Sequence, residues 1–129
     1  MTSTREERVA EFMSAGDTAV FDSEAVNPDQ TNMIFNCIIE EFNEFVEAAA
    51  QYELDSFSTE RRANLCKEWA DLQYVISQAA VYYGIPAEEA FTRVADNNMT
   101  KVVDGKVLKR EDGKILKPDN YVPANMEGL

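Results

Sequence analysis

The fold is decided by residues 27–52, which read NPDQTNMIFNCIIEEFNEFVEAAAQY. Asn27 can cap a helix, Pro28 suits the first helical position, and Asp29 places an acid in the first turn. Apolar residues then recur at helical spacing on one side, namely Ile34, Phe35, Ile38, Phe42, Phe45, Val46 and Ala49. The segment is therefore predicted to be a long amphipathic helix whose apolar side faces a core.

Three further helices are predicted on either side of this segment, over residues 3–16, 58–83 and about 85–101. The first begins at overlapping capping boxes, in which Ser3 or Thr4 precedes a glutamate by three residues. The next one ends at Gly84, and the last begins with an early proline. Residues 16–27 are predicted to form a loop. Four helices with mostly short connections predict an all-α, four-helix bundle-like fold.

After about residue 101 the helical periodicity of apolar residues ends, and short runs bounded by turn residues follow. The stretch DGKVLK at 104–109 nearly repeats as DGKILK at 112–117, and the turn residues at 110–113 predict a small hairpin between the two copies. We therefore expect a single domain over residues 1–129, with core helices at about 28–101 and a basic tail at 102–129.

The chain has no histidine and two widely separated cysteines, Cys37 and Cys66. This composition excludes Ser-His-Asp and Cys-His nucleophile systems and argues against a zinc site. Any metal must then be bound by oxygen, which favours Mg²⁺, Mn²⁺ or Ca²⁺. The sequence has no secretory signal and no apolar run of membrane-spanning length, so a cytoplasmic protein with reduced thiols and no membrane partner is expected.

The formal net charge of −12 is unevenly distributed. Residues 1–100 contain six basic and nineteen acidic side chains, whereas residues 101–117 contain six basic and three acidic ones. An acidic body argues against binding to duplex nucleic acid. The basic segment could receive one small polyphosphate, or it could be a solvated loop.

Two pairs of acids lie at the edge of, or within, the apolar sides of their helices. Glu41 lies at the edge of the apolar side of its helix, with Glu44 as its i,i+3 neighbour. Glu68 projects into the apolar side of the third helix, beside Asp71, where that side comprises Leu65, Trp69, Leu72, Val75, Ile76, Ala79 and Tyr83. A carboxylate on a core face is costly unless it is paired or bound to metal.

The two acid pairs are therefore predicted to face each other across the bundle and to bind a divalent cation. Two alternatives remain open. The pair on the second helix could be a solvated face, and Glu68 could instead pair with Arg62 or Arg93.

The motifs Glu40-Glu41-x-x-Glu44 and Glu68-x-x-Asp71, with 23 residues between them, resemble those of the MazG-like nucleoside triphosphate pyrophosphohydrolases. That superfamily includes dimeric dUTPases and phosphoribosyl-ATP pyrophosphohydrolases. The resemblance implies a hydrolase that cleaves a nucleoside triphosphate to the monophosphate and pyrophosphate, and a house-cleaning role is one of the roles that it allows.

The resemblance also implies roles for individual residues. The ligands of Mg²⁺, or of Mn²⁺ in its place, would be Glu41, Glu44, Glu68 and Asp71. Glu40 would bind a second metal ion or help to activate water. Asn98 and Lys101 would contact phosphate or sugar, and Lys109 is a weaker candidate that could equally be a solvated lysine. The resemblance assigns no base-binding residue. Trp69 could stack on a base, although aromatic residues at helical spacing more often belong to the core.

Two other functions remain open at this point. The first is a dUTPase-like or phosphoribosyl-ATP-like specialist, and the second is a non-catalytic helical assembly module with a vestigial acidic site. A homodimer or homotetramer is also expected, because the chain is short and the end of the third helix carries the apolar residues Val81, Tyr82 and Tyr83.

Overall fold

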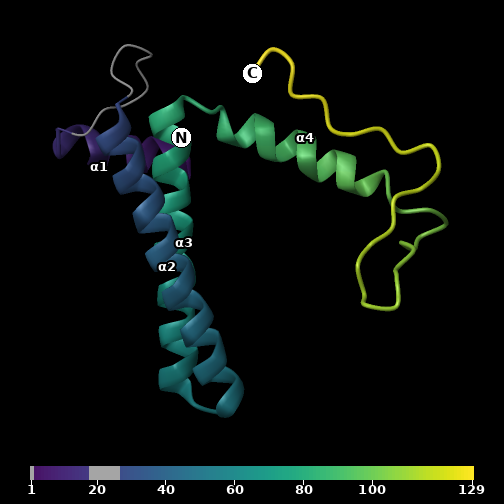
Figure 1. Cartoon of the computed structure of the whole chain (residues 1–129), viewed down its shortest axis with the longest axis horizontal. Coiled ribbons are helices and arrows are strands. Elements are labelled where there is room, and N and C mark those ends of the chain that lie inside the picture. Colours follow the sequence, from purple (N-terminus) through teal and green to yellow (C-terminus); the bar gives the residue numbers. More distant parts are fainter. Residues whose placement is uncertain (1, 18–26) are drawn as a thin grey trace. The chain divides into compact units, whose positions relative to one another are not determined.

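The computed structural model describes residues 2–17 and 27–129, and this part of the chain contains four helices and no strand (Figure 1). The helices are α1 (Arg5–Ala15), α2 (Pro28–Leu54), α3 (Thr59–Tyr83) and α4 (Ala87–Met99). The predicted all-α fold is confirmed, and each predicted helix is present within a few residues of its expected bounds. Most of the predicted loop at 16–27, from 18 to 26, lies outside the described residues.

Local chemistry determines where the helices begin and end. Thr4 caps α1 in a reciprocal capping box with Glu7, with distances of 2.8 and 3.1 Å, so the second of the two predicted boxes is the one that forms. The Asn27 side chain accepts a hydrogen bond from the backbone N–H of Gln30 at the start of α2. At the end of α3, Gly84 adopts the left-handed conformation with φ of 65°.

The described residues divide into two compact units, of which the first is Met1–Ile85. In this unit α2 and α3 form a helical hairpin, and α1 packs against α3. The buried core consists of Val9, Met13, Ile34, Val81 and Tyr82. The Tyr82 hydroxyl lies at hydrogen-bonding distance from both the Asn27 backbone and the Thr31 side chain, which joins the start of α2 to the end of α3.

The second unit, Pro86–Leu129, consists of α4 and the tail that follows it. The Arg93 guanidinium donates to the carbonyls of Asn125 and Glu127, and Asn97 bonds both to the Val122 carbonyl and to the Tyr121 hydroxyl. The predicted hairpin at 104–117 is present only as an isolated antiparallel bridge between Lys109 and Ile115 with its adjoining turn.

The apolar side predicted for α2 is only partly buried. Ile34 is 6% exposed, but Phe35, Phe42 and Val46 are each about half exposed. Conversely, Val81 and Tyr82 belong to the core of the single chain. The sequence had led us to expect them at a subunit interface. The physical reason is that α2 packs along one line on α3, so that only the residues on this line are covered.

None of the helices in residues 2–17 and 27–129 is both long enough and apolar enough to cross a membrane.

Candidate functional site

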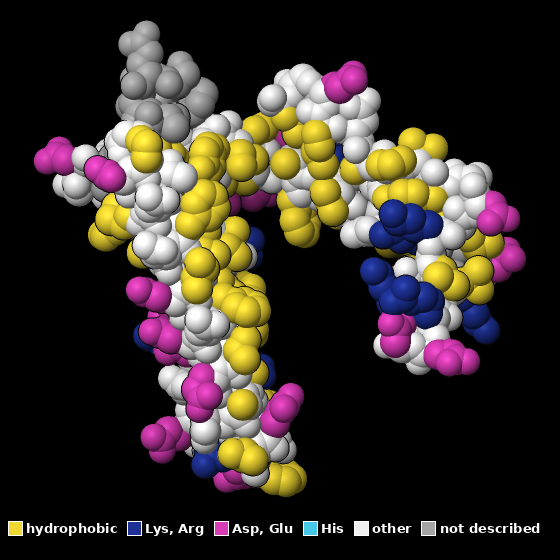
Figure 2. Space-filling model, in the orientation of Figure 1, with side chains coloured by type: hydrophobic (Ala, Val, Ile, Leu, Met, Phe, Trp, Pro, Cys, Tyr) yellow, Lys and Arg dark blue, Asp and Glu magenta, His cyan; other side chains and the backbone are white. Residues whose placement is uncertain are grey.

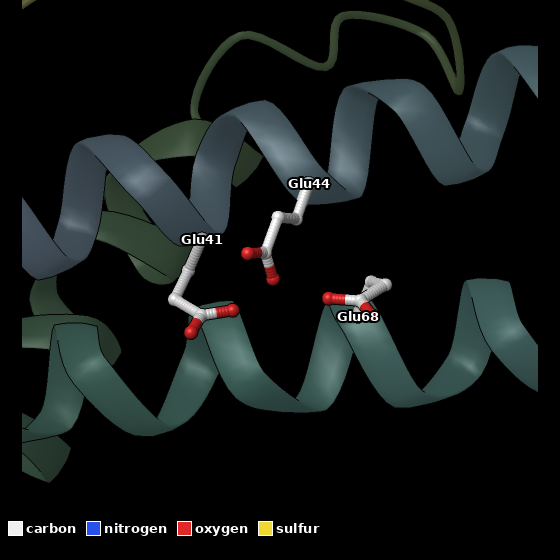
Figure 3. Close-up of side chains that lie close together, drawn as sticks. All are labelled: Glu41, Glu44 and Glu68. Atoms are coloured by element: carbon white, nitrogen blue, oxygen red, sulfur yellow. The ribbon is translucent and has the colours of Figure 1, made fainter.

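Three of the predicted acids converge between α2 and α3. Glu41 and Glu44 extend from neighbouring turns of α2 toward Glu68 on α3 (Figure 3). One carboxylate oxygen from each residue lies within 4.8 Å of the others. Oxygens that bind one Mg²⁺ at about 2.1 Å are separated by no more than roughly 4.2 Å. A small closing movement of the side chains would therefore suffice to coordinate a single ion.

The burial of these carboxylates leaves part of their charge without a partner. Glu68 has only 12% of its side chain exposed. One oxygen of Glu41 and one of Glu68 are buried without a hydrogen-bond partner among the described residues. Burial, together with repulsion by Glu44 and Asp71, raises the pKa of Glu41 above its ordinary value of 4.5. An all-oxygen site with orphaned acceptors and mutual repulsion fits a hard divalent cation.

The fourth predicted ligand, Asp71, is paired with a cation of the protein itself. The Lys67 ammonium lies 2.7 Å from Asp71 Oδ2 and 3.5 Å from Glu68 Oε1. Asp71 remains close enough to contribute to the raised pKa of Glu41. It is not among the three residues whose oxygens meet within 4.8 Å.

Within the first unit, the alternative that Glu68 pairs with Arg62 is wrong, because the ion-pair partner of Glu68 among the described residues is Lys67. Arg93 belongs to the second unit. Arg62 lies over the Tyr52 ring, and Arg93 pairs with Glu89. The sequence reasoning missed Lys67, although its i,i+4 spacing to Asp71 is a usable signal, because the two side chains lie on the same face of α3.

A hollow of about 370 Å³ lies beside the acid cluster and is walled partly by Glu44 and Glu68. Its remaining wall includes three amide side chains that the sequence reasoning did not single out, Asn43, Gln51 and Asn64. Amides can both donate to phosphate oxygens and accept from a sugar hydroxyl. Asn64 lies one helical turn before Glu68, so the helical spacing could have identified it.

The remaining predicted residues of the first unit lie outside the cluster. Glu40 is exposed on α2. Trp69 is half exposed and lines two hollows, one between α1 and α3 and one between α2 and α3, and neither is lined by the three glutamates.

The predicted substrate-binding residues Asn98, Lys101 and Lys109 belong to the second unit. The Lys101 ammonium donates to Asn98 Oδ1 at 3.0 Å and lies 5.5 Å from the centre of the Tyr121 ring. Lys117 approaches the same ring at 5.1 Å. Lys109 is exposed and lies opposite Ile115 in the isolated bridge. Within this unit, Lys101 and Lys117 thus form a small cationic group around one aromatic ring.

Comparison with protein families shows that residues 6–98 match the model of phosphoribosyl-ATP pyrophosphohydrolase. The chain belongs to this family. As a phosphoribosyl-ATP pyrophosphohydrolase family member it lies within the MazG-like superfamily, which confirms the resemblance noted in the sequence. It is accordingly a pyrophosphohydrolase that acts on nucleotide-like substrates. The match extends from α1 to the end region of α4 and includes all four predicted metal ligands. Comparison with curated proteins gives no match.

Proposed function

We propose that this pyrophosphohydrolase cleaves a nucleoside triphosphate to the monophosphate and pyrophosphate, with Mg²⁺ or Mn²⁺ bound by Glu41, Glu44, Glu68 and Asp71. The observation that carries the proposal is the approach of three glutamate oxygens to within 4.8 Å, with buried oxygens of Glu41 and Glu68 left unpaired. Such a cluster is repulsive by itself, and a divalent cation would turn that repulsion into attraction.

The proposed reaction joins a water oxygen to the α-phosphorus and breaks the bond from this phosphorus to the oxygen that bridges it to the β-phosphorus. The bridging oxygen leaves with pyrophosphate and keeps the electron pair. A bound divalent cation would neutralise part of the phosphate charge and polarise the α-phosphoryl group that water attacks. The proton lost by water requires an acceptor, and the exposed Glu40, which precedes Glu41 on α2, is the proposed acceptor unless it binds a second cation.

The amide-lined hollow supports a site for the rest of the substrate. Asn43, Gln51 and Asn64 stand beside the acids and could hold phosphate or ribose oxygens. Asn98 and Lys101, which are joined by a hydrogen bond, are proposed to bind phosphate, with Lys109 in a weaker role.

Phosphoribosyl-ATP is the second candidate substrate, and the family match over residues 6–98 favours it. It contains the same triphosphate linkage, so the same carboxylates would serve either reaction.

The decisive experiment measures pyrophosphate release from the common nucleoside triphosphates, dUTP and phosphoribosyl-ATP, in Mg²⁺, Mn²⁺ and EDTA. Broad turnover of triphosphates supports the proposal, and turnover of one compound alone shows a specialist. Absence of release from every compound by the folded protein would indicate an assembly module.

The exposed apolar residues support a homodimer, or a homotetramer made of two such dimers. Figure 2 shows apolar side chains along the length of the helical hairpin. On α2 the exposed residues Phe35, Ile39, Phe42 and Val46 follow one another at intervals of four, three and four. This is the spacing of a helix-packing seam, and a second copy could cover it.

A cytoplasmic location is also proposed, because both cysteines are free thiols.

A further inference from the structure

A groove between α1 and α3 stands apart from the acid cluster. It has a volume of about 330 Å³ and is lined by Arg5 and Arg8 from α1 and by Trp69, Gln73, Tyr74 and Ser77 from α3. The acid cluster lies between α3 and the other neighbour of that helix, α2. Trp69 follows Glu68 directly, so their side chains leave α3 about 100° apart. The groove and the cluster therefore open on different sides of α3.

The charged side chains that line the groove are both basic, and the carboxylate of Glu6 lies behind them, bonded to Ser77. The chain carries 24 acidic and 12 basic side chains. Nevertheless, neither Arg5 nor Arg8 forms an ion pair with any acid of residues 2–17 and 27–129. The two arginines are i,i+3 neighbours on one face of α1. Two adjacent guanidiniums that pair with no acid in this part of the chain provide the bidentate donors that a phosphate group accepts.

The floor of the groove is polar and held in place. Ser77 is only 2% exposed and donates to Glu6 at 3.1 Å, while the Gln73 amide donates to Ser77 at 3.2 Å. This chain of hydrogen bonds fixes the Gln73 amide and leaves its Oε1 without a partner in the described residues. A fixed amide with a vacant acceptor can recognise the hydrogen-bonding edge of a planar ring.

The walls of the groove are aromatic. Trp69 is 50% and Tyr74 40% exposed, so both rings present a face or an edge to a ligand. Tyr74 is held by an edge-to-face contact with Phe12 on α1, with 6.0 Å between ring centres. A heteroaromatic base could therefore stack on these rings while its phosphate reaches the arginines.

From these features we propose that the groove between α1 and α3 binds a nucleoside monophosphate, at a site separate from the acidic cluster. Two arginines match one phosphate group, the two rings match one base, and Gln73 supplies a hydrogen bond to its edge. If the proposed reaction is correct, the ligand has the chemistry of one of its products. The binding itself depends on neither the metal nor catalysis.

Trp69 allows a direct test, because it is the only tryptophan of the chain and stands in the groove. Its fluorescence is titrated with AMP, adenosine, ribose 5-phosphate and inorganic phosphate, in EDTA so that no divalent cation is bound. We expect AMP to give a saturable change with half-saturation below about 1 mM, and each of the three partial ligands to bind at least about tenfold more weakly.

Variants separate this groove from other sites. Arg5→Gln and Arg8→Gln should each weaken AMP binding about tenfold, the effect of losing one charged hydrogen-bond donor. Arg62→Gln is the matched control, because Arg62 lines the other hollow beside Trp69 and not this groove. Glu68→Gln should leave AMP binding unchanged. Melting curves of each variant verify that it is folded.

Four outcomes would overturn the proposal: no saturable change with millimolar AMP, equal weakening by Arg62→Gln, loss of binding in Glu68→Gln, or ribose 5-phosphate binding as tightly as AMP. None of these bears on pyrophosphate release, so the groove and the proposed reaction can fail independently.

Discussion

At the scale of single residues, Glu68 is the one on which the proposed chemistry depends most directly. It is the only member of the three-glutamate cluster contributed by α3, and its side chain is almost buried. The substitution Glu68→Gln keeps the shape of the side chain but removes the negative charge that a cation needs. We expect pyrophosphate release to fall by about two orders of magnitude or more, measured at steady state with the preferred nucleotide.

The double variant Glu68→Gln, Asp71→Asn should add little further loss if both side chains serve the same ion. Melting in EDTA provides the folding control, because removing one of several repelling carboxylates should not destabilise the metal-free protein. A folded Glu68→Gln protein with near-full activity would show that the acid cluster is not the active site.

Glu41 makes the stability of the metal-free protein depend on pH. Its pKa is raised above 4.5 in the folded state, so the folded protein binds this proton more tightly than the unfolded chain does. The contribution of Glu41 to the free energy of unfolding is thus fully present below about pH 4.5 and is lost as the pH rises through the raised pKa.

Glu41→Gln, which is neutral at every pH, should therefore be more stable than the wild type at pH 7 in EDTA. The difference in melting temperature should shrink as the pH falls toward about 4.5. Glu53→Gln, which removes an exposed carboxylate from the same helix, serves as control. A difference between wild type and Glu41→Gln that does not vary with pH would contradict the explanation.

Lys67 competes with the proposed cation, because its ammonium already lies 2.7 Å from Asp71. Lys67→Gln should raise the apparent affinity for Mg²⁺ several-fold in calorimetry without nucleotide, since a nearby positive charge and a competitor are both removed. Lys67→Arg keeps the charge and should resemble the wild type. An equal rise in Lys106→Gln, a lysine of the second unit, would mean that net charge alone is responsible.

At the scale of the elements, the end of α3 depends on the conformation of one glycine. Gly84 has φ of 65°, a left-handed conformation that costs a residue with a Cβ atom about 1 kcal/mol. Gly84→Ala should therefore lower the free energy of unfolding by about this amount in urea denaturation. Gly16, which follows α1 with φ of −91°, is the matched control, and Gly16→Ala should be neutral or slightly stabilising. Equal effects of the two changes would refute the explanation.

At the scale of the whole molecule, the exposed seam on α2 predicts association between copies. Phe42→Glu places a charge in the middle of this seam and should convert the proposed homodimer to a monomer at micromolar concentration, as measured by light scattering. Asn36→Glu adds the same charge at an exposed polar position of α2 and should leave the mass unchanged. A monomeric wild type would remove the basis of this prediction.

Much of the fold could be predicted because its signals are local. Asn27 and Pro28 begin α2, and Gly84 ends α3, through hydrogen bonds and dihedral preferences that involve only neighbouring residues. The i,i+3 acid pairs likewise follow from helical geometry alone. The sequence thus determined the number and type of the helices and their approximate bounds. It also predicted that the pair Glu41 and Glu44 faces the pair Glu68 and Asp71, of which the structure brings Glu41, Glu44 and Glu68 together.

Only the tertiary structure decided which side of each helix is covered. Phe35 and Phe42 remain exposed while Val81 and Tyr82 are buried, because burial depends on where α1 and α2 lie against α3. The packing of the helices also forms the groove that Arg5 and Arg8 line. Likewise, the structure and not the sequence analysis revealed the pairing of Asp71 with Lys67. Helical periodicity specifies which residues share a face, but the direction in which that face points is determined by contacts between segments far apart in the chain.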